Sequence, residues 1–184
     1  MTSDEERCAE QERFKRIDAA FRAGDLAAVE DPHAVPNGPM PLAIGPCLEY
    51  AIYHSPLSFI RTLLEIGADP NPEDRIGFPP LIAALSCSRS QPGAPARPNV
   101  AHILRLLLTF RADPTQRGIN DYTAMHMAVA ERNAVAVAIL LEAGADPRLR
   151  TRIDECETPR EMAEGMGVHE IADRLATSEA RRRP

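Results

Sequence analysis

A helix–turn–helix pattern that ends in Ala-Asp-Pro recurs along this chain of 184 residues. The three-letter ending stands at residues 68–70, 112–114 and 145–147. The most regular copy, residues 121–147, reads DYTAMHMAVAERNAVAVAILLEAGADP. Its apolar spacing predicts two helices separated at residues 132–133, with Thr123 capping the first and Gly144 ending the second. Because a helix pair of this size cannot bury its own apolar face, the pattern predicts a stack of such pairs.

Further copies keep the same register. We expect five repeats, which cover residues 13–40, 41–73, 74–117, 118–150 and 151–177 and together form one domain, 13–177. In the last four repeats the residue after the N-cap position is Cys47, Pro80, Ala124 and Pro159, at intervals of 33, 44 and 35 residues. The long interval contains an insertion at residues 87–98, whose density of Pro and Gly predicts an exposed loop. A 33-residue period with two helices is typical of stacked repeat proteins.

The two ends of the chain are atypical, as the outer repeats of a stack tend to be. Ile17 and Phe21 lie on one face of an expected helix in the first repeat, which lacks a glycine stop and runs into a proline-rich stretch. A charged segment, residues 1–12, precedes this repeat, and a polar, Arg-rich tail, residues 178–184, follows the fifth. We interpret the tail as solvated.

Composition excludes several classes of protein. The net charge is −6 and neither half of the chain is basic, so we expect no nucleic-acid partner. No apolar run approaches 18 residues, and the charged N-terminus has no apolar core, so we expect neither a membrane span nor export by a signal peptide. The four cysteines are widely spaced, which indicates reduced thiols in a cytoplasmic protein. We expect no cofactor, because no nucleotide-binding or metal-binding motif is present.

These repeats resemble the ankyrin repeat family, whose pattern is roughly G-x-T-P-L-H-x-A, a turn, and a second helix that ends L-L-x-x-G-A-D. Residues 123–128 match the first part with Ala in place of Pro, and residues 63–69 and 140–146 match the second part. Gly77–Leu81 matches the opening loosely, and Thr158-Pro159 matches the last start. The resemblance covers about residues 14–176 and implies an all-α solenoid of stacked helix–turn–helix units with short β-turn or hairpin tips.

By this resemblance, His126 hydrogen-bonds to backbone near the adjoining turn and stabilises the stack. Asp121 and Glu131 lie near it in sequence and leave a metal or catalytic site as an alternative, although metal sites need more convergent ligands than this. The other repeats carry Glu49, Ile82 and Glu161 in place of this histidine, and we expect them to lose the bond.

Arg111 stands where the other second helices have Gly67 and Gly144. A left-handed backbone at Arg111 would store strain of about 1 kcal/mol. We therefore expect Arg111→Gly to raise thermal stability. The alternative is that Arg111 makes a surface contact.

In ankyrin-like stacks, the first helices and the turn tips build a concave binding face. On this sequence the candidates are Tyr53, His54, Arg75, Ile76, Phe78, Ser86, Ile119, Asn120, Tyr122, Ala130, Glu131, Asp154, Glu155 and Glu157. Phe78 and Tyr122 occupy equivalent places in consecutive repeats, either as recognition anchors or packed on their own turns. His54 fits the end of a turn better than a ligand or a pH switch.

No catalytic motif accompanies the repeats. The sequence therefore predicts a non-enzymatic protein-binding module, an adaptor, inhibitor or scaffold that is monomeric on its own. The alternatives are an accessory or targeting subunit of an enzyme complex and a bacterial immunity or effector protein. The insertion at 87–98 has three interpretations: a tolerated loop, a segment ordered by the partner, or a cover for the concave face.

Overall fold

The computed structural model of this chain describes residues 3–29, 35–43, 45–73, 77–90, 95–118, 120–153 and 155–181. Within these ranges every regular element is a helix, and one isolated antiparallel bridge joins Pro39 and Pro46. The predicted all-α class is therefore confirmed. The chain divides into two compact parts, which we call the N-terminal unit (residues 1–80) and the C-terminal unit (residues 81–184). None of the described helices is both long and apolar enough to cross a membrane.

The described residues of the N-terminal unit form three α-helices and two short 3₁₀ helices. In chain order they are α1 (Ser3–Ala23), η1 (Leu26–Ala28), η2 (Pro41–Ala43), α2 (Cys47–His54) and α3 (Leu57–Glu65). The first helix begins ten residues before the expected first repeat and so includes most of the charged segment. Asp25 caps η1, because its carboxylate accepts the backbone N–H groups of Ala27 and Ala28.

Aromatic side chains fasten α1 to the helix pair α2–α3. The Phe21 ring lies edge-on to Phe59 and Tyr50, with centroids 5.0 and 5.8 Å apart. The Tyr50 hydroxyl donates a hydrogen bond to the carboxylate of Asp18 on α1. The first repeat is thus held against the second by a small aromatic core to which both contribute.

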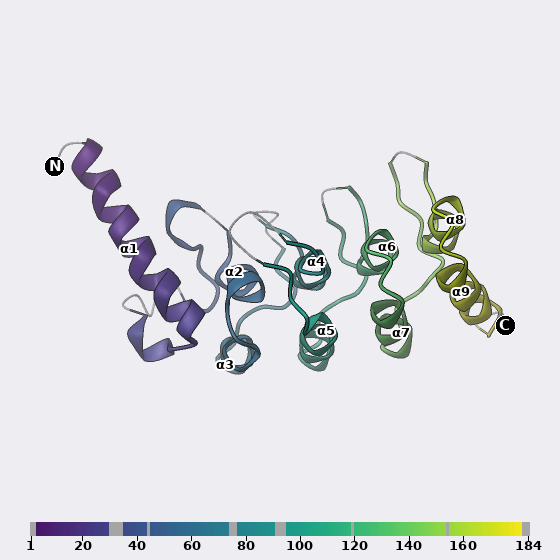
Figure 1. Cartoon of the computed structure of the whole chain (residues 1–184), viewed down its shortest axis with the longest axis horizontal. Coiled ribbons are helices and arrows are strands. Elements are labelled where there is room, and N and C mark those ends of the chain that lie inside the picture. The colour runs from purple at the N-terminus through teal and green to yellow at the C-terminus, as the bar shows by residue number, and fades with distance from the viewer. Residues whose placement is uncertain are drawn as a thin grey trace. The chain divides into compact units, whose positions relative to one another are not determined.

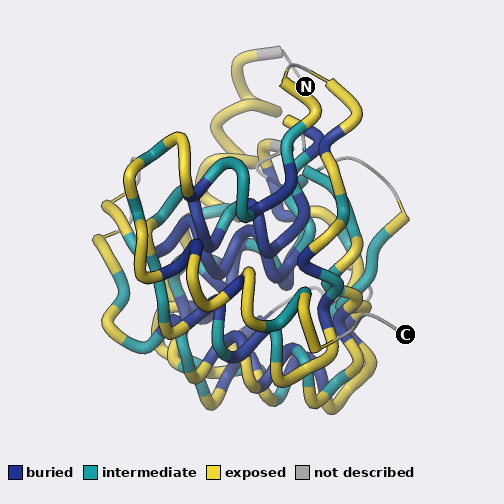
Figure 2. The backbone as a smooth tube through the Cα atoms, turned by 90° about the vertical axis from the view of Figure 1, so that its right-hand side faces the viewer, coloured by how far each residue is buried: buried dark blue, intermediate teal, exposed yellow. Residues whose placement is uncertain are grey.

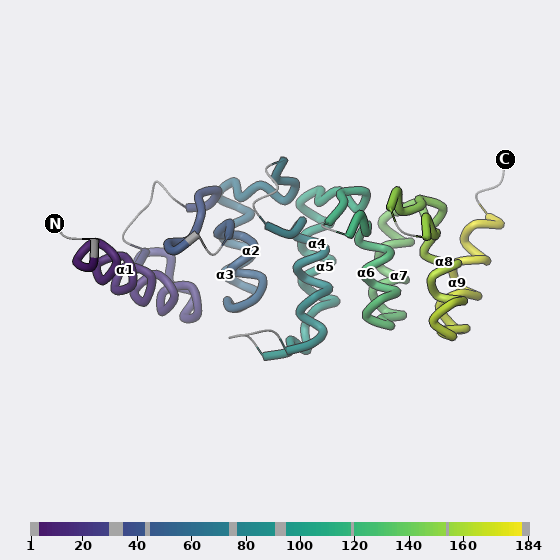
Figure 3. The backbone as a smooth tube through the Cα atoms, turned by 90° about the horizontal axis from the view of Figure 1, so that it is seen from above, coloured from purple at the N-terminus to yellow at the C-terminus, as the bar shows by residue number. Residues whose placement is uncertain are grey.

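The C-terminal unit stacks helix pairs in two layers. Its helices are α4 (Pro80–Ser86), α5 (Val100–Thr109), α6 (Ala124–Ala130), α7 (Ala134–Glu142), α8 (Pro159–Gly165) and α9 (His169–Arg181). Helices α5, α7 and α9 pack side by side in one layer, while α6 packs on α8 in the other (Figures 1 and 3). This is the predicted repeat solenoid. The last helix continues to Arg181, beyond the expected end of the fifth repeat at residue 177.

Buried leucines fill the space between these layers. Leu104, Leu107 and Leu140 are fully buried, as is Met125 on α6. Exposed residues lie mainly along the loops and on the outer sides of the helices (Figure 2). Helix α5 thus buries one apolar face, which includes Ile103, Leu104 and Leu107.

The ends of the second helices have the predicted left-handed backbone. Gly67 and Gly144 have φ of 100° and 89°, and Arg111 adopts φ of 65° at the equivalent place. The structure adds Arg132, which has φ of 52° in the turn between α6 and α7. Two arginines of the C-terminal unit therefore hold a conformation that favours glycine.

Candidate partner-binding surface

The predicted surface residues fall into three groups. Arg75, Ile76, Ile119 and Asp154 lie outside the described residues. In the N-terminal unit, Tyr53, His54 and Phe78 are half-buried. In the C-terminal unit, Asn120 and Glu155 are exposed, Tyr122, Ala130, Glu131 and Glu157 are half-buried, and Ser86 is buried. Their role in binding stays a prediction.

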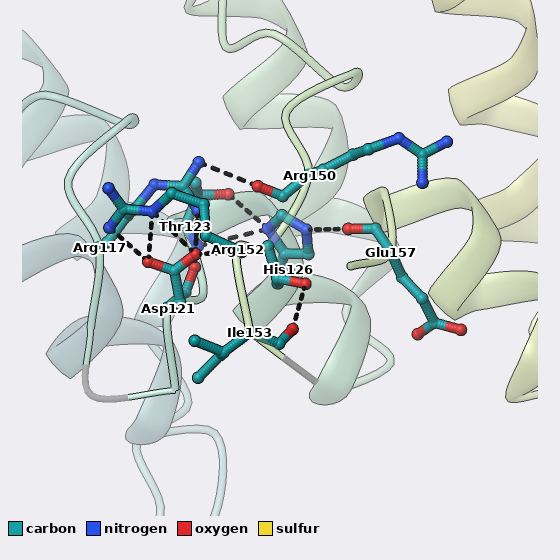
Figure 4. Close-up of polar contacts among 9 residues, drawn as sticks. Arg117, Asp121, Thr123, His126, Arg150, Arg152, Ile153 and Glu157 are labelled. Atoms are coloured by element: carbon teal, nitrogen blue, oxygen red, sulfur yellow. Dashed lines mark hydrogen bonds and ion pairs between the residues drawn. The ribbon is translucent and has the colours of Figure 1, made fainter. Parts of the chain in front are cut away.

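The tip that precedes α6 is held by an ionic network around Asp121 (Figure 4). The Asp121 carboxylate lies 2.7 Å from Arg117 and 2.6 Å from Arg152, and it also accepts the backbone N–H of Arg152. Arg117 donates a further bond, 3.0 Å long, to the carbonyl oxygen of Arg150. The hydrogen bond from Arg152 lowers the pKa of Asp121 to about 2, and the two nearby positive charges act in the same direction. Asp121 therefore stays ionised and fastens this tip to the next.

His126 makes a second link between the same two tips. Its Nδ1 accepts the backbone N–H of Thr123 at 3.3 Å, so the ring proton is on Nε2. That Nε2–H donates to the carbonyl oxygen of Glu157 at 3.1 Å (Figure 4). Burial lowers the pKa of His126 below its ordinary value of 6.5, which favours the neutral ring that this geometry requires. The predicted structural role of His126 is confirmed.

Tyr122 packs on this buried histidine. The two rings are stacked, with centroids 5.7 Å apart and planes inclined by 20°. The packing interpretation of Tyr122 therefore has direct support, and only part of the ring is left for a partner. Over the described ranges no group of three or more His, Cys, Asp or Glu residues could hold a metal ion.

Glu49 makes the equivalent link in the N-terminal unit, and here our prediction was wrong. Glu49 occupies the histidine position, and its Oε1 accepts the backbone N–H of Phe78 at 3.2 Å. Phe78 and Glu157 both stand two residues before the first residue of the next first helix. The bond is not lost, because a glutamate side chain reaches as far as the imidazole and accepts an N–H where histidine donates to a carbonyl.

Glu161 also keeps polar partners at the histidine position of the last repeat. Its carboxylate accepts the backbone N–H of Thr158 at 2.8 Å and forms an ion pair with Arg150 at 2.7 Å. The Thr158 hydroxyl accepts the N–H of Glu161 in return, which completes the predicted capping box. Ile82 occupies the histidine position of the third repeat. It is buried, and its side chain has no polar atom with which to make such a bond.

Comparison with known families agrees with this geometry. The ankyrin repeat family model matches residues 120–152, which contain α6, α7 and the tip ahead of α8. Residues 120–152 are therefore similar to an ankyrin repeat. No curated protein matches the chain. Ankyrin repeats are typically non-catalytic, so the matched repeat marks the chain as a protein-interaction module in general terms.

The N-terminal unit contains a cavity of about 470 Å³. Glu49 and Phe78 line it together with Pro36, Asn37, Pro46, Leu48, Asp69, Pro72, Glu73 and Pro80. Burial raises the pKa of Glu49, and the bond from Phe78 opposes this. A Cβ on Gly77 would lie 1.9 Å from Glu49 Oε2 and 2.9 Å from Pro46 Cδ, so a larger residue here would displace the Glu49 carboxylate from its present position. The cavity walls come from stretches far apart in sequence, which is why repeat matching alone did not find it.

The root of the insertion between α4 and α5 is closed by a backbone hydrogen bond. The backbone N–H of Arg97 donates to the carbonyl oxygen of Cys87 at 2.8 Å, and burial raises the pKa of the Cys87 thiol to about 11. Arg89 forms an ion pair with Glu131, with Nε and Oε2 2.7 Å apart. Residues 91–94 lie outside the described residues. Sequence reasoning placed Glu131 on the binding face and missed its partner, because no sequence spacing relates residues 89 and 131.

Proposed function

We propose that this chain is a non-catalytic ankyrin-repeat module that binds another protein and acts in the cytoplasm as an adaptor, inhibitor or scaffold. It binds as a monomer and carries no chemistry of its own. The support is the matched ankyrin repeat at residues 120–152, because such repeats serve mainly in protein recognition.

The observation that supports binding at this surface is the set of hydrogen bonds that hold the tip ahead of α6 in place without a partner. Asp121 and His126 both tie this tip to the one ahead of α8. A surface fixed in this way loses little conformational entropy on binding, so more of the contact energy remains as affinity. Asn120 and Glu155, which are exposed beside these links, are the side chains that the two tips present.

We place the contact residues in each unit separately. In the C-terminal unit they are Ser86, Asn120, Tyr122, Glu131, Glu155 and Glu157, and in the N-terminal unit they are Tyr53, His54 and Phe78. Arg75, Ile76, Ile119 and Asp154 complete the expected set outside the described residues. The chain's net charge of −6 favours a basic partner surface.

The test is a quantitative pull-down followed by titration of the recovered protein. We expect Tyr122→Ala and Phe78→Ala each to weaken binding by about tenfold, as for moderate hot-spot residues. Arg105→Ala, an exposed change on α5, is the matched control and leaves binding unchanged. Thermal melts of every variant separate lost contacts from lost folding. Recovery of no specific partner, or equal binding by all variants, would overturn the proposal.

A further inference from the structure

Glu131 is a nearly buried carboxylate at the end of α6. Its side chain is only 8% exposed, whereas its ion-pair partner, Arg89, is 65% exposed. A buried carboxylate is stable only when a cation accompanies it. The arginine, by contrast, lies largely in water and comes from the root of the insertion.

Two oxygen atoms lie close to the Arg89 guanidinium group. The Ala130 carbonyl accepts a hydrogen bond from it, whereas the contact with Glu131 is an ion pair in which Oε2 accepts no hydrogen bond from the described residues. Its Nε lies 2.7 Å from Glu131 Oε2, and its Nη2 donates to the carbonyl oxygen of Ala130 at 3.1 Å. The Ala130 carbonyl belongs to the last residue of α6, where helix geometry leaves carbonyl oxygens without intrahelical donors. A planar guanidinium can pair with a carboxylate and donate to a neighbouring carbonyl oxygen at the same time, while an ammonium is a single point charge.

Arg89 is not required to close the root of the insertion. The N–H of Arg97 donates to the carbonyl of Cys87, and the N–H of Ala96 donates to Ser90 Oγ at 3.3 Å. These two bonds join the two sides of the root on their own. The Arg89 side chain is therefore replaceable without opening the loop at its base.

We propose that Glu131 and the Ala130 carbonyl form an arginine-binding site for the partner, and that Arg89 occupies this site in the free chain. This inference rests on the proposed function, since the site lies among the predicted contact residues. A partner arginine exchanges with Arg89, so the buried carboxylate is never left without a cation. Because Arg89 is tethered, its effective concentration is high and the apparent affinity for an outside arginine is reduced.

The probe is a blocked tripeptide, acetyl-Gly-Arg-Gly-amide, titrated by NMR into the full chain. Arg89→Ala binds this peptide at least about tenfold more tightly than the wild type, because the internal competitor is gone. Adding Glu131→Gln to Arg89→Ala reverses the gain, and the peptide with Lys in place of Arg shows a smaller gain. Arg105→Ala is the control for loss of a positive charge and binds as the wild type does.

Arg89→Ala leaves the Glu131 carboxylate without its ion-pair partner and can lower stability. Thermal melts therefore accompany the titration and show whether each variant is folded. Arg89→Gln is the second variant, which retains a side-chain donor for the Ala130 carbonyl and carries no charge. The proposed site is contradicted if Arg89→Ala and the Arg89→Ala/Glu131→Gln double variant bind the peptide equally. It is also contradicted if the wild type binds the peptide as tightly as Arg89→Ala does. The titration needs no identified partner, so it fails or succeeds separately from the pull-down. If a recovered partner binds Arg89→Ala, the double variant and the wild type with equal affinity, the site takes no part in partner recognition.

Discussion

The two units solve one structural problem with opposite chemistry. In the C-terminal unit, His126 donates a hydrogen bond from Nε2 to the carbonyl of Glu157. In the N-terminal unit, Glu49 stands at the same repeat position and accepts the backbone N–H of Phe78. Both bonds join a first helix to the tip of the following repeat. The repeat geometry therefore specifies the reach of this side chain and leaves its hydrogen-bonding polarity open.

The two solutions differ in burial and so in their response to pH. His126 is completely buried, and the pKa of its ring is lowered, so its contribution to stability is present above about pH 6.5 and is lost as the pH falls toward the lowered value. Glu49 lines a cavity, and its pKa is raised. The stabilisation that comes from this raised pKa is present below about pH 4.5 and is lost as the pH rises through the raised value, while the hydrogen bond from Phe78 is available to the ionised carboxylate as well.

The largest effect is expected from His126→Ala. This change leaves the Thr123 N–H and the Glu157 carbonyl without partners and opens space in the core, so we expect a loss of about 2–4 kcal/mol in the free energy of unfolding. Glu49→Ala, at a partly solvated site, is expected to lose about 1 kcal/mol. Denaturant unfolding at neutral pH measures both values.

His102→Ala is the control for His126→Ala, because His102 is an exposed histidine on α5 of the same unit. We expect the control to match the wild type. The loss of stability on acidification should also be smaller in His126→Ala than in the wild type. Equal losses from His126→Ala and Glu49→Ala would contradict the distinction drawn between the two links.

A smaller effect of opposite sign is expected from Glu49→Gln. The amide oxygen of Gln keeps the acceptor for the Phe78 N–H and removes the charge that burial penalises. We expect the variant to gain about 0.5 kcal/mol at neutral pH after allowance for solvent screening, and to gain nothing below about pH 4. Unfolding measured across this pH range is the test.

Glu65→Gln removes the same charge from an exposed position on α3 and serves as the matched control. A similar gain in the free energy of unfolding for the control would show that the effect comes from the change in net charge alone. Lower stability of Glu49→Gln at neutral pH, with no loss below about pH 4, would show that the charged carboxylate is favoured in the folded state.

Local patterns predicted the elements of this fold well. Thr123, Gly144 and Thr158 stand at the predicted helix boundaries, because caps and left-handed stops depend on a few neighbouring residues. Contacts between distant segments were less predictable. The pairing of Arg89 with Glu131 and the cavity around Glu49 depend on how loops without a repeat pattern pack, and no periodicity encodes that.

The smallest effect concerns the ends of the second helices, where Arg111 differs from Gly67 of the N-terminal unit and from Gly144 of its own unit. Helix α3 of the N-terminal unit is followed by Gly67, whereas α5 of the C-terminal unit is followed by Arg111 in the same left-handed conformation. Arg111→Gly removes strain of about 1 kcal/mol but adds freedom to the unfolded chain, so we expect a net gain of about 0.5 kcal/mol.

The reciprocal change provides the control, because a Cβ at Gly144 would meet no atom within 4 Å and would test the backbone alone. We expect Gly144→Ala to lose about 1 kcal/mol, since alanine is strained at positive φ. Calorimetric melting temperatures of both variants decide the matter. An unchanged or lower melting temperature for Arg111→Gly, alongside a destabilised Gly144→Ala, would mean that the Arg111 side chain makes a contact worth more than its backbone strain.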